Sequence, residues 1–156
     1  MRSDRIDIFS GVPLLAAPSD RAGTTGDAFA VARRLTAAVW IFDIDESRVY
    51  CANDPACRLW QADSEAALCS RDLGKDMSPT VAKRLKQYKA DFIDRDATFT
   101  EMWTLYPGGK PTSVMVVFRG IYLPDGRMAM LCEVIGAADD EPDNLRSAEA
   151  LLHTDV

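Results

Sequence analysis

The stretch from Ala38 to Trp60, AVWIFDIDESRVYCANDPACRLW, largely determines the fold expected for this chain. Val39 to Phe42 is a run of β-branched and aromatic residues and Arg48 to Cys51 alternates, so both segments are predicted strands. The polar run from Asp43 to Ser47 turns the chain between them. The sequence Asn-Asp-Pro at residues 53–55 then starts a helix, because asparagine and aspartate cap helix N-termini and proline suits the first turn.

Helices are predicted in the middle of the chain. One runs from Asp54 to Trp60, and a shorter one runs from Ser64 to Leu68 with its first residue as the cap. Ser78 and Pro79 start a longer helix that ends near Asp94. Its apolar residues recur at steps of four, three and four, which places one stripe on the core: Val81, Leu85, Tyr88 and Phe92.

Three strands are predicted in the second half of the chain: Thr98 to Tyr106, Ser113 to Tyr122 and Arg127 to Ile135. The proline- and glycine-rich run at 107–111 and the turn Pro-Asp-Gly at 124–126 reverse the chain between them. Two strands, a helical middle and three strands in a meander define an α+β domain. Its five strands form one antiparallel sheet, and the helices cover one face of that sheet.

In this order the elements resemble a PAS domain over Ala37 to Gly136. The matches are FD at residues 42–43, AN at 52–53, WTLYPG at 103–108 and PDGR at 124–127. PAS domains are sensory and interaction modules, found in bacteria ahead of signalling enzymes. The resemblance therefore implies a PAS fold and a role in signal transduction rather than in catalysis.

Four segments are expected along the chain. Residues 1–24 form a poorly ordered leader, 25–36 an N-terminal cap helix, 37–136 the PAS domain, and 137–156 a linker helix toward a further signalling domain. The N-terminal helix has an apolar face and is expected to cap the domain edge or to pair with a second copy in a homodimer: Phe29, Ala32 and Leu35.

The end of the last strand departs from the PAS pattern. PAS domains commonly close this strand with an Asp-x-Thr motif, where this chain has Glu133, Val134 and Ile135, so the hydroxyl is missing. The helix that follows is expected to carry the signal, because apolar residues return at the spacing of a paired-helix seam: Leu145, Ala148 and Leu152.

Charge and hydropathy argue against nucleic-acid binding, a membrane span and secretion. A formal net charge of −6 provides no basic field for nucleic acid, and the one positive stretch is expected to be a solvated helix face: Lys83, Arg84, Lys86 and Lys89. No run approaches the about 20 apolar residues that a membrane span needs. The N-terminus also lacks the layout of a secretory signal, so a cytoplasmic location is expected.

A ligand cavity between the helices and the inner face of the sheet is the candidate site that the resemblance implies. Two interpretations of the aromatic and methionine side chains there are open, since they either line such a cavity or simply fill the core. Asn53 is interpreted mainly as a turn and cap residue. The candidate set is Trp40, Phe42, Tyr50, Asn53, Trp60, Trp103, Met115, Val117 and Met130.

No haem, photoactive flavin or metal is expected. Haem-binding PAS domains generally use a histidine on or near the long helix, whereas the single histidine here is His153 in the tail. Flavin-adduct relatives carry Asn-Cys-Arg-Phe-Leu, and the sequence CRL at 57–59 falls in a different helix. The cysteines form no C-x-x-C pair: Cys51, Cys57, Cys69 and Cys132. Binding of a small apolar ligand is the alternative that the sequence leaves open.

The function expected from these features is a ligand- or partner-sensing module that signals to an output domain such as a histidine kinase or a cyclic-dinucleotide enzyme. One alternative is a constitutive dimerisation domain without a ligand. Another is a small cone-shaped α+β enzyme with Glu101 as a buried general base, although a pair between Glu101 and Arg119 on adjacent strands is the expected arrangement.

The purified protein should show neither a Soret band nor flavin absorbance after gel filtration, because it lacks the histidine and the cysteine motif that these groups use. An absorbance spectrum of protein from its own host tests this expectation. A chromophore that stays with the protein through the column contradicts it.

Overall fold

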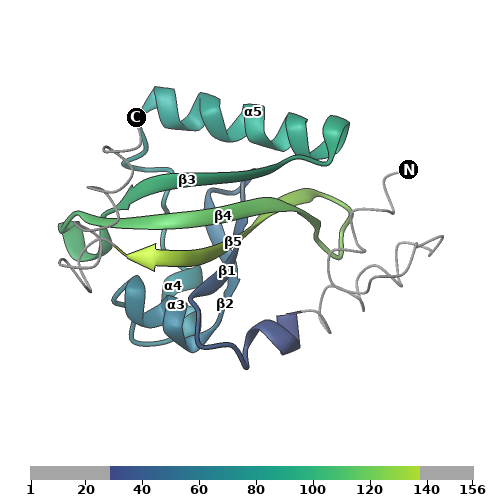
Figure 1. The fold of residues 1–156 in the computed structure, drawn as a ribbon. Coiled ribbons are helices and arrows are strands. Elements are labelled where there is room, and N and C mark those ends of the chain that lie inside the picture. The colour runs from purple at the N-terminus through teal and green to yellow at the C-terminus, as the bar shows by residue number, and fades with distance from the viewer. Residues whose placement is uncertain (1–28, 138–156) are drawn as a thin grey trace, which may run out of the picture.

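A single antiparallel sheet organises the part of the chain that the computed structural model describes, residues 29–137. Its strands lie in the order β2-β1-β5-β4-β3 (Figure 1). They are β1 (Val39–Asp43), β2 (Arg48–Ala52), β3 (Thr98–Leu105), β4 (Thr112–Tyr122) and β5 (Met128–Ala137). The α+β class and the five-stranded sheet predicted from the sequence are confirmed. The leader and linker helix expected at the ends of the chain lie outside the described residues.

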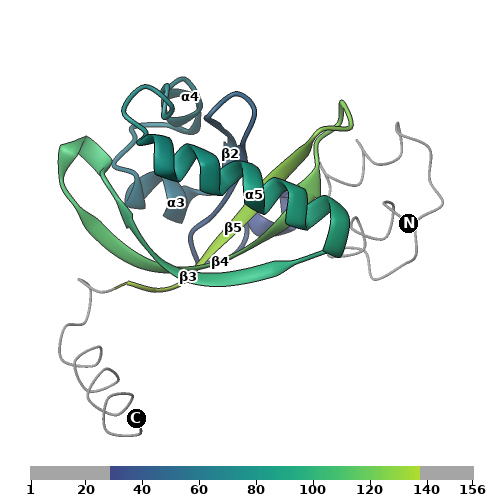
Figure 2. The ribbon, with the colours of Figure 1, turned by 90° about the horizontal axis from the view of Figure 1, so that it is seen from above.

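Three helices connect β2 to β3 and gather on one side of the sheet (Figure 2): α3 (Asp54–Leu59), α4 (Glu65–Cys69) and α5 (Pro79–Arg95). Each begins where the sequence predicts. The side chains of Asn53, Ser64 and Ser78 accept hydrogen bonds from backbone N–H groups in the first turns of the three helices. These caps satisfy donors that a helix otherwise leaves free, so the starts are fixed locally.

The main core lies between these helices and the inner face of the sheet. Leu85, Tyr88 and Phe92 of α5 are buried in it as expected, whereas Val81 is 46% exposed because it belongs to the first turn, beyond the sheet's cover. The rings of Tyr88 and Phe118 lie 4.8 Å apart, and those of Phe99 and Phe118 lie 5.4 Å apart. Aromatic contacts therefore join α5 to β3 and β4.

A second core covers part of the opposite face. Phe29 and Ala32, from the short helical segment that opens the described residues, are 4% and 3% exposed and pack on outward residues of the central strands. The residues that they pack on are Val39, Ile41, Ile121, Ala129 and Leu131 of the strands and Leu123 directly after β4. Leu35 is 45% exposed. Phe29 and Ala32, expected on a face that caps the domain or meets a second copy, thus contact the chain's own sheet.

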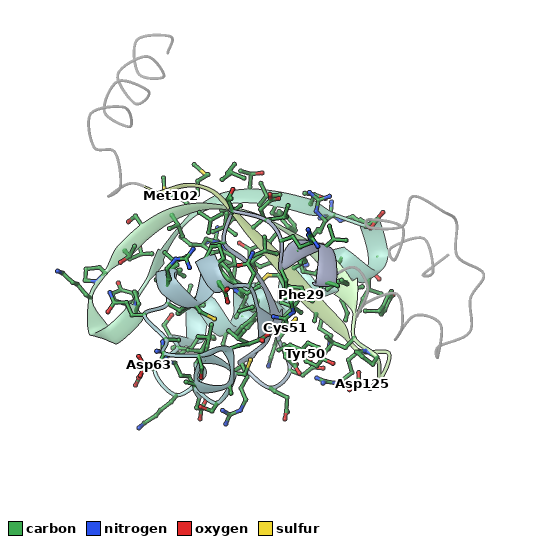
Figure 3. The ribbon with its side chains drawn as sticks, turned by 90° about the horizontal axis from the view of Figure 1, so that it is seen from below. Phe29, Tyr50, Cys51, Asp63, Met102 and Asp125 are labelled. Carbon is green, nitrogen blue, oxygen red and sulfur yellow. The ribbon has the colours of Figure 1, made fainter. Side chains whose placement is uncertain are left out.

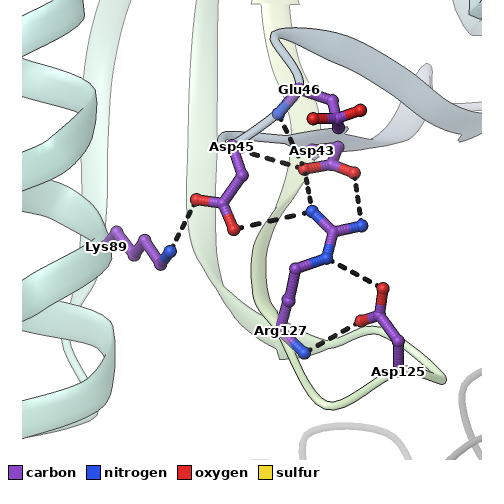
Figure 4. A network of polar contacts seen from close by, with 6 residues as sticks. All are labelled: Asp43, Asp45, Glu46, Lys89, Asp125 and Arg127. Atoms are coloured by element: carbon purple, nitrogen blue, oxygen red, sulfur yellow. Dashed lines mark hydrogen bonds and ion pairs between the residues drawn. The ribbon is translucent and has the colours of Figure 1, made fainter.

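A network of charged groups joins the turns at one end of the sheet to α5 (Figure 4). Arg127, at the start of β5, donates to both carboxylate oxygens of Asp43 at 2.7 and 2.8 Å. The same Asp43 carboxylate accepts backbone N–H groups of the β1–β2 turn. Arg127 also bonds Asp125, and Lys89 of α5 pairs with Asp45 at 2.6 Å. Two of the sequence matches, FD and PDGR, are therefore physically connected.

Gly120 of β4 sets how closely α5 approaches the sheet. A Cβ atom at this position would lie 2.7 Å from both the Cβ of Phe92 and the Sδ of Met128. These distances are too short for carbon contacts, so any side chain at this position forces the helix and the sheet apart.

The substitution Gly120→Ala should therefore destabilise the fold by about 1–3 kcal/mol, the usual cost of overpacking a tight core. Urea unfolding followed by tryptophan fluorescence measures the loss. Gly136→Ala is the matched control on β5, because the nearest atom to its added Cβ lies 3.9 Å away. Equal stabilities for the two variants would show that α5 is not held by this contact.

Candidate functional site

Six of the nine candidate cavity residues lie on or beside the main core. Trp40, Phe42 and Met130 are buried in it, and Trp60 and Trp103 are half-buried and pack against it. Asn53 is buried at the start of α3. The ring of Trp103 lies 4.8 Å from that of Phe118. The inner face thus carries aromatic rings, and the ligand cavity among them stays a prediction.

Met115 and Val117 lie on the opposite face of the sheet, so their placement beside Trp40 is wrong. Their neighbours Val114, Val116 and Phe118 are the β4 residues that enter the main core. The error has a physical reason. The run VMVVF at 114–118 is apolar at every position, so its alternation carries no information about which side chains point inward.

Tyr50 is also misplaced by the prediction, since its side chain is 43% exposed. The pairing of β1 with β2 shifts between Ile41, opposite Cys51, and Phe42, opposite Val49. Tyr50 is therefore the extra residue of a β-bulge, where strict alternation fails. Figure 3 shows it at the surface, well away from Met102 on β3.

Trp60 carries a buried polar atom that has no partner among residues 29–137. This atom is the indole N–H, and the ring meets Trp40 edge to face at 5.8 Å. The backbone around it is fixed, because the guanidinium of Arg71 donates to the carbonyl oxygens of Trp60 and Gln61 at 2.7 and 2.9 Å. A buried donor left unpaired is costly, so this N–H is suited to donate a hydrogen bond to an acceptor on a ligand.

Asn53 connects α3 to the segment that enters the sheet. Its Oδ1 accepts from the backbone N–H groups of Val39 and Ala56, both at 3.0 Å. Its Nδ2 donates to the carbonyl oxygens of Ala32 and Ala37 at 3.0 and 2.8 Å. Both amide hydrogens and both acceptor positions are used. The cap role is confirmed, and no bonding position is left for a ligand.

Arg33 and Glu65 reinforce the same junction. The guanidinium donates to both carboxylate oxygens of Glu65 at 3.0 and 2.9 Å. The two side chains also bond the backbone of Ala52, through its carbonyl oxygen and its N–H group respectively. Burial raises the pKa of Glu65, but hydrogen bonds from Arg33 and Ala52 outweigh it and hold the pKa below its ordinary value. This carboxylate thus remains charged at neutral pH.

Glu101 does not pair with Arg119. In the ladder Glu101 lies opposite Val116 and Arg119 opposite Thr98, so the two side chains point to different faces. The Oε1 of Glu101 accepts from the hydroxyl of Tyr88 at 2.6 Å, and Arg84 lies 3.6 Å from it. Burial, followed by this hydrogen bond, raises the pKa of Tyr88 to about 12. The carboxylate thus has a structural partner on α5 that the sequence did not indicate.

The thiols offer little reactivity. Burial is the largest cause that raises the pKa of Cys51 to about 12, and it raises the pKa of Cys132 well above its ordinary value. Such thiols are protonated and poor nucleophiles. Within residues 29–137, no cluster of three or more potential ligands is arranged to hold a metal ion. No helix of this part of the chain is both long and apolar enough for a membrane span.

An open groove of about 930 Å³ lies beside α3, outside the main core. Its walls come from the segment before β1, from α3, from the β3–β4 connection and from the end of β5. The lining residues are Thr36, Ala37, Ala38, Pro55, Arg58, Leu59, Gln61, Lys110, Pro111, Thr112, Val134, Ile135 and Gly136. Except for Val134 and Ile135, cited for the missing motif, the sequence drew no attention to these residues as a site.

No family model and no curated protein sequence matches the chain. Solved structures do. A Rhodobacter sphaeroides LOV protein superposes with a TM-score of 0.54 at 16% identity, over 76% of this chain and 69% of its own. The PAS domain of nitrogen regulation protein NR(II) from Vibrio parahaemolyticus gives 0.51 at 16%, over 69% and 94%. The PAS domain of BvgS from Bordetella pertussis gives 0.53 at 12%, over 85% and 98%. The chain therefore has the PAS fold.

The variant Asn53→Asp should separate the two roles of this side chain. It keeps the oxygen that caps α3 but turns a carboxylate oxygen toward the carbonyls of Ala32 and Ala37. Each donated bond left unmade should cost about 1–3 kcal/mol. Hydrogen exchange should therefore accelerate at residues 29–38 while α3 stays protected.

Asn53→Ala is the control, because it removes the cap as well and should also expose α3. Exchange at 29–38 that stays at the wild-type rate in Asn53→Asp would mean that these two bonds do not hold the segment.

Proposed function

We propose that this chain is a sensory PAS module that converts ligand or partner occupancy beside α3 into a change at the ends of the sheet. The observation that carries the proposal is the set of four hydrogen bonds around Asn53. They bind the start of α3, the start of β1 and the segment before β1 to one buried side chain. A displacement of α3 therefore has a direct route to the sheet.

The same route continues to the exit of the chain. The N–H of Val134 donates to the carbonyl oxygen of Ala38 at 3.0 Å, and Val39 lies opposite Glu133 in the ladder. Entry and exit strands are thus neighbours at the point that Asn53 controls. If α3 has two arrangements, each one would favour a different position of the entry strand and of the exit strand. That is the population shift that a sensor requires.

The ligand we propose is small and mainly apolar with one hydrogen-bond acceptor. The aromatic wall near Trp40 supports the apolar body, and the unpaired N–H of Trp60 supports the acceptor. Small-molecule sites are usually mainly apolar with a few polar groups, so a site that opens between these side chains when α3 moves has the usual composition. The proposed output is a domain further along the chain, such as a histidine kinase or a cyclic-dinucleotide enzyme. The structural likeness to the PAS domain of a nitrogen regulation protein supports this signalling role.

Constitutive dimerisation is the second candidate, and one observation favours it. Part of the outer sheet face is uncovered among residues 29–137, where Met102 is 49% and Ile135 is 55% exposed. The enzymatic alternative loses its supporting observation, because the carboxylate of Glu101 is bonded to Tyr88. The cytoplasmic location and the exit helix with Leu145, Ala148 and Leu152 remain predictions.

Native mass spectrometry of protein purified from its own host should reveal an additional small-molecule mass. Trp60→Phe should lose that mass, because phenylalanine keeps a ring beside Trp40 but has no N–H. Trp103→Phe is the matched control on the other half-buried tryptophan and should retain it. A dimer without additional mass would instead support constitutive dimerisation, and a monomer without it would contradict both roles.

A further inference from the structure

The groove beside α3 has the position and charge of a binding surface. It is lined by residues of α3, the β3–β4 connection and the end of β5. Figures 1 and 2 show these three segments at the same end of the sheet. Ile135 is the extra residue of a bulge in β5, since Met115 lies opposite Gly136 and Val116 opposite Val134. Its exposed side chain gives the groove an apolar wall.

The charge of the groove has one sign. Among the described residues, Arg58 and Lys110 are its only charged lining residues, and both are exposed. Within the described part of the chain neither side chain has an ion-pair or hydrogen-bond partner, whereas the side chains of Arg33, Arg84, Arg95 and Arg127 all do. Two unpaired cations in a partly apolar groove favour an acidic, extended occupant.

The chain itself supplies such an occupant. Residues 138–144, ADDEPDN, follow the groove residue Gly136 almost at once and carry four carboxylates: Asp139, Asp140, Glu141 and Asp143. An extended chain covers about 3.3 Å per residue, so Asp139 to Glu141 come within about 10–17 Å of Gly136. A tether this short gives an effective concentration in the millimolar range or above. Weak ion pairs are then sufficient for binding.

We propose that the acidic segment 138–144 binds in this groove through Arg58 and Lys110. The proline at 142 suits an extended backbone there, because it favours extended conformation in the residue before it. Binding holds the exit of β5 against α3, so the groove becomes a second contact between helix and exit besides Asn53. This interaction needs no ligand in the core and is independent of the proposed sensory function.

Hydrogen exchange at amides 138–144 tests the proposal in the full chain. In 50 mM salt the amides should exchange at least threefold more slowly than in a free peptide of residues 134–146. R58Q/K110Q should bring the rates to those of the peptide, and so should D139N/D140N/E141Q when compared with its own peptide. The five substitutions together should have no larger effect than either set. Salt at 0.5 M should remove the protection, because it screens exposed ion pairs.

K83Q/K86Q is the matched control, since it removes two exposed cations from α5 and should leave the protection unchanged. The β5 amides report in every variant that the sheet is folded. Peptide-like rates in the wild type, or protection that survives R58Q/K110Q, would overturn the proposal. Protection that increases with protein concentration would also overturn it, because the occupant would then be the acidic segment of a second copy.

Discussion

The ion pair between Asp43 and Arg127 is the interaction on which the arrangement of the sheet depends. It joins residues 84 positions apart and so places the first strand of the chain beside the last. The carboxylate of Asp43 is almost fully buried, with 7% of its side chain exposed, and it also accepts two backbone N–H groups of the β1–β2 turn. Without Arg127 this buried charge would cost several kcal/mol. The pair therefore joins the end of β1 to the start of β5 in addition to the backbone ladder between these strands.

Much of this architecture is predictable because its signals are local. The caps at Asn53, Ser64 and Ser78 lie within three residues of the helix N–H groups that they cap, and the turn at 124–126 is defined by its own residues. Non-local features escape prediction. The bulge at Tyr50 depends on the partner strand, and the apolar run around Met115 has no phase of its own. The partner of Glu101 is Tyr88 on α5, so a search of the neighbouring strand does not find it.

The candidate site shows the same division. Aromatic side chains around Trp40 could be predicted, because large apolar residues on a central strand are almost always inside. The two polar features on which the proposed role rests could not be predicted from the sequence. Asn53 has every bonding position filled, whereas the N–H of Trp60 has no partner in the described part of the chain, and only the folded structure distinguishes the two. Asn53 therefore suits the transmission of a movement of α3 to the sheet, and Trp60 suits the recognition of a ligand.

The apolar residues on both faces of β1 have a consequence for where the folding unit begins. Trp40 and Phe42 enter the main core, while Val39 and Ile41 need Phe29 and Ala32 as their cover. A recombinant fragment trimmed to the first strand would keep all five strands and still present bare hydrocarbon to water on a central strand. Such a fragment tends to aggregate. Boundaries chosen from the sheet alone would thus yield an insoluble domain, and expression should start upstream of Phe29.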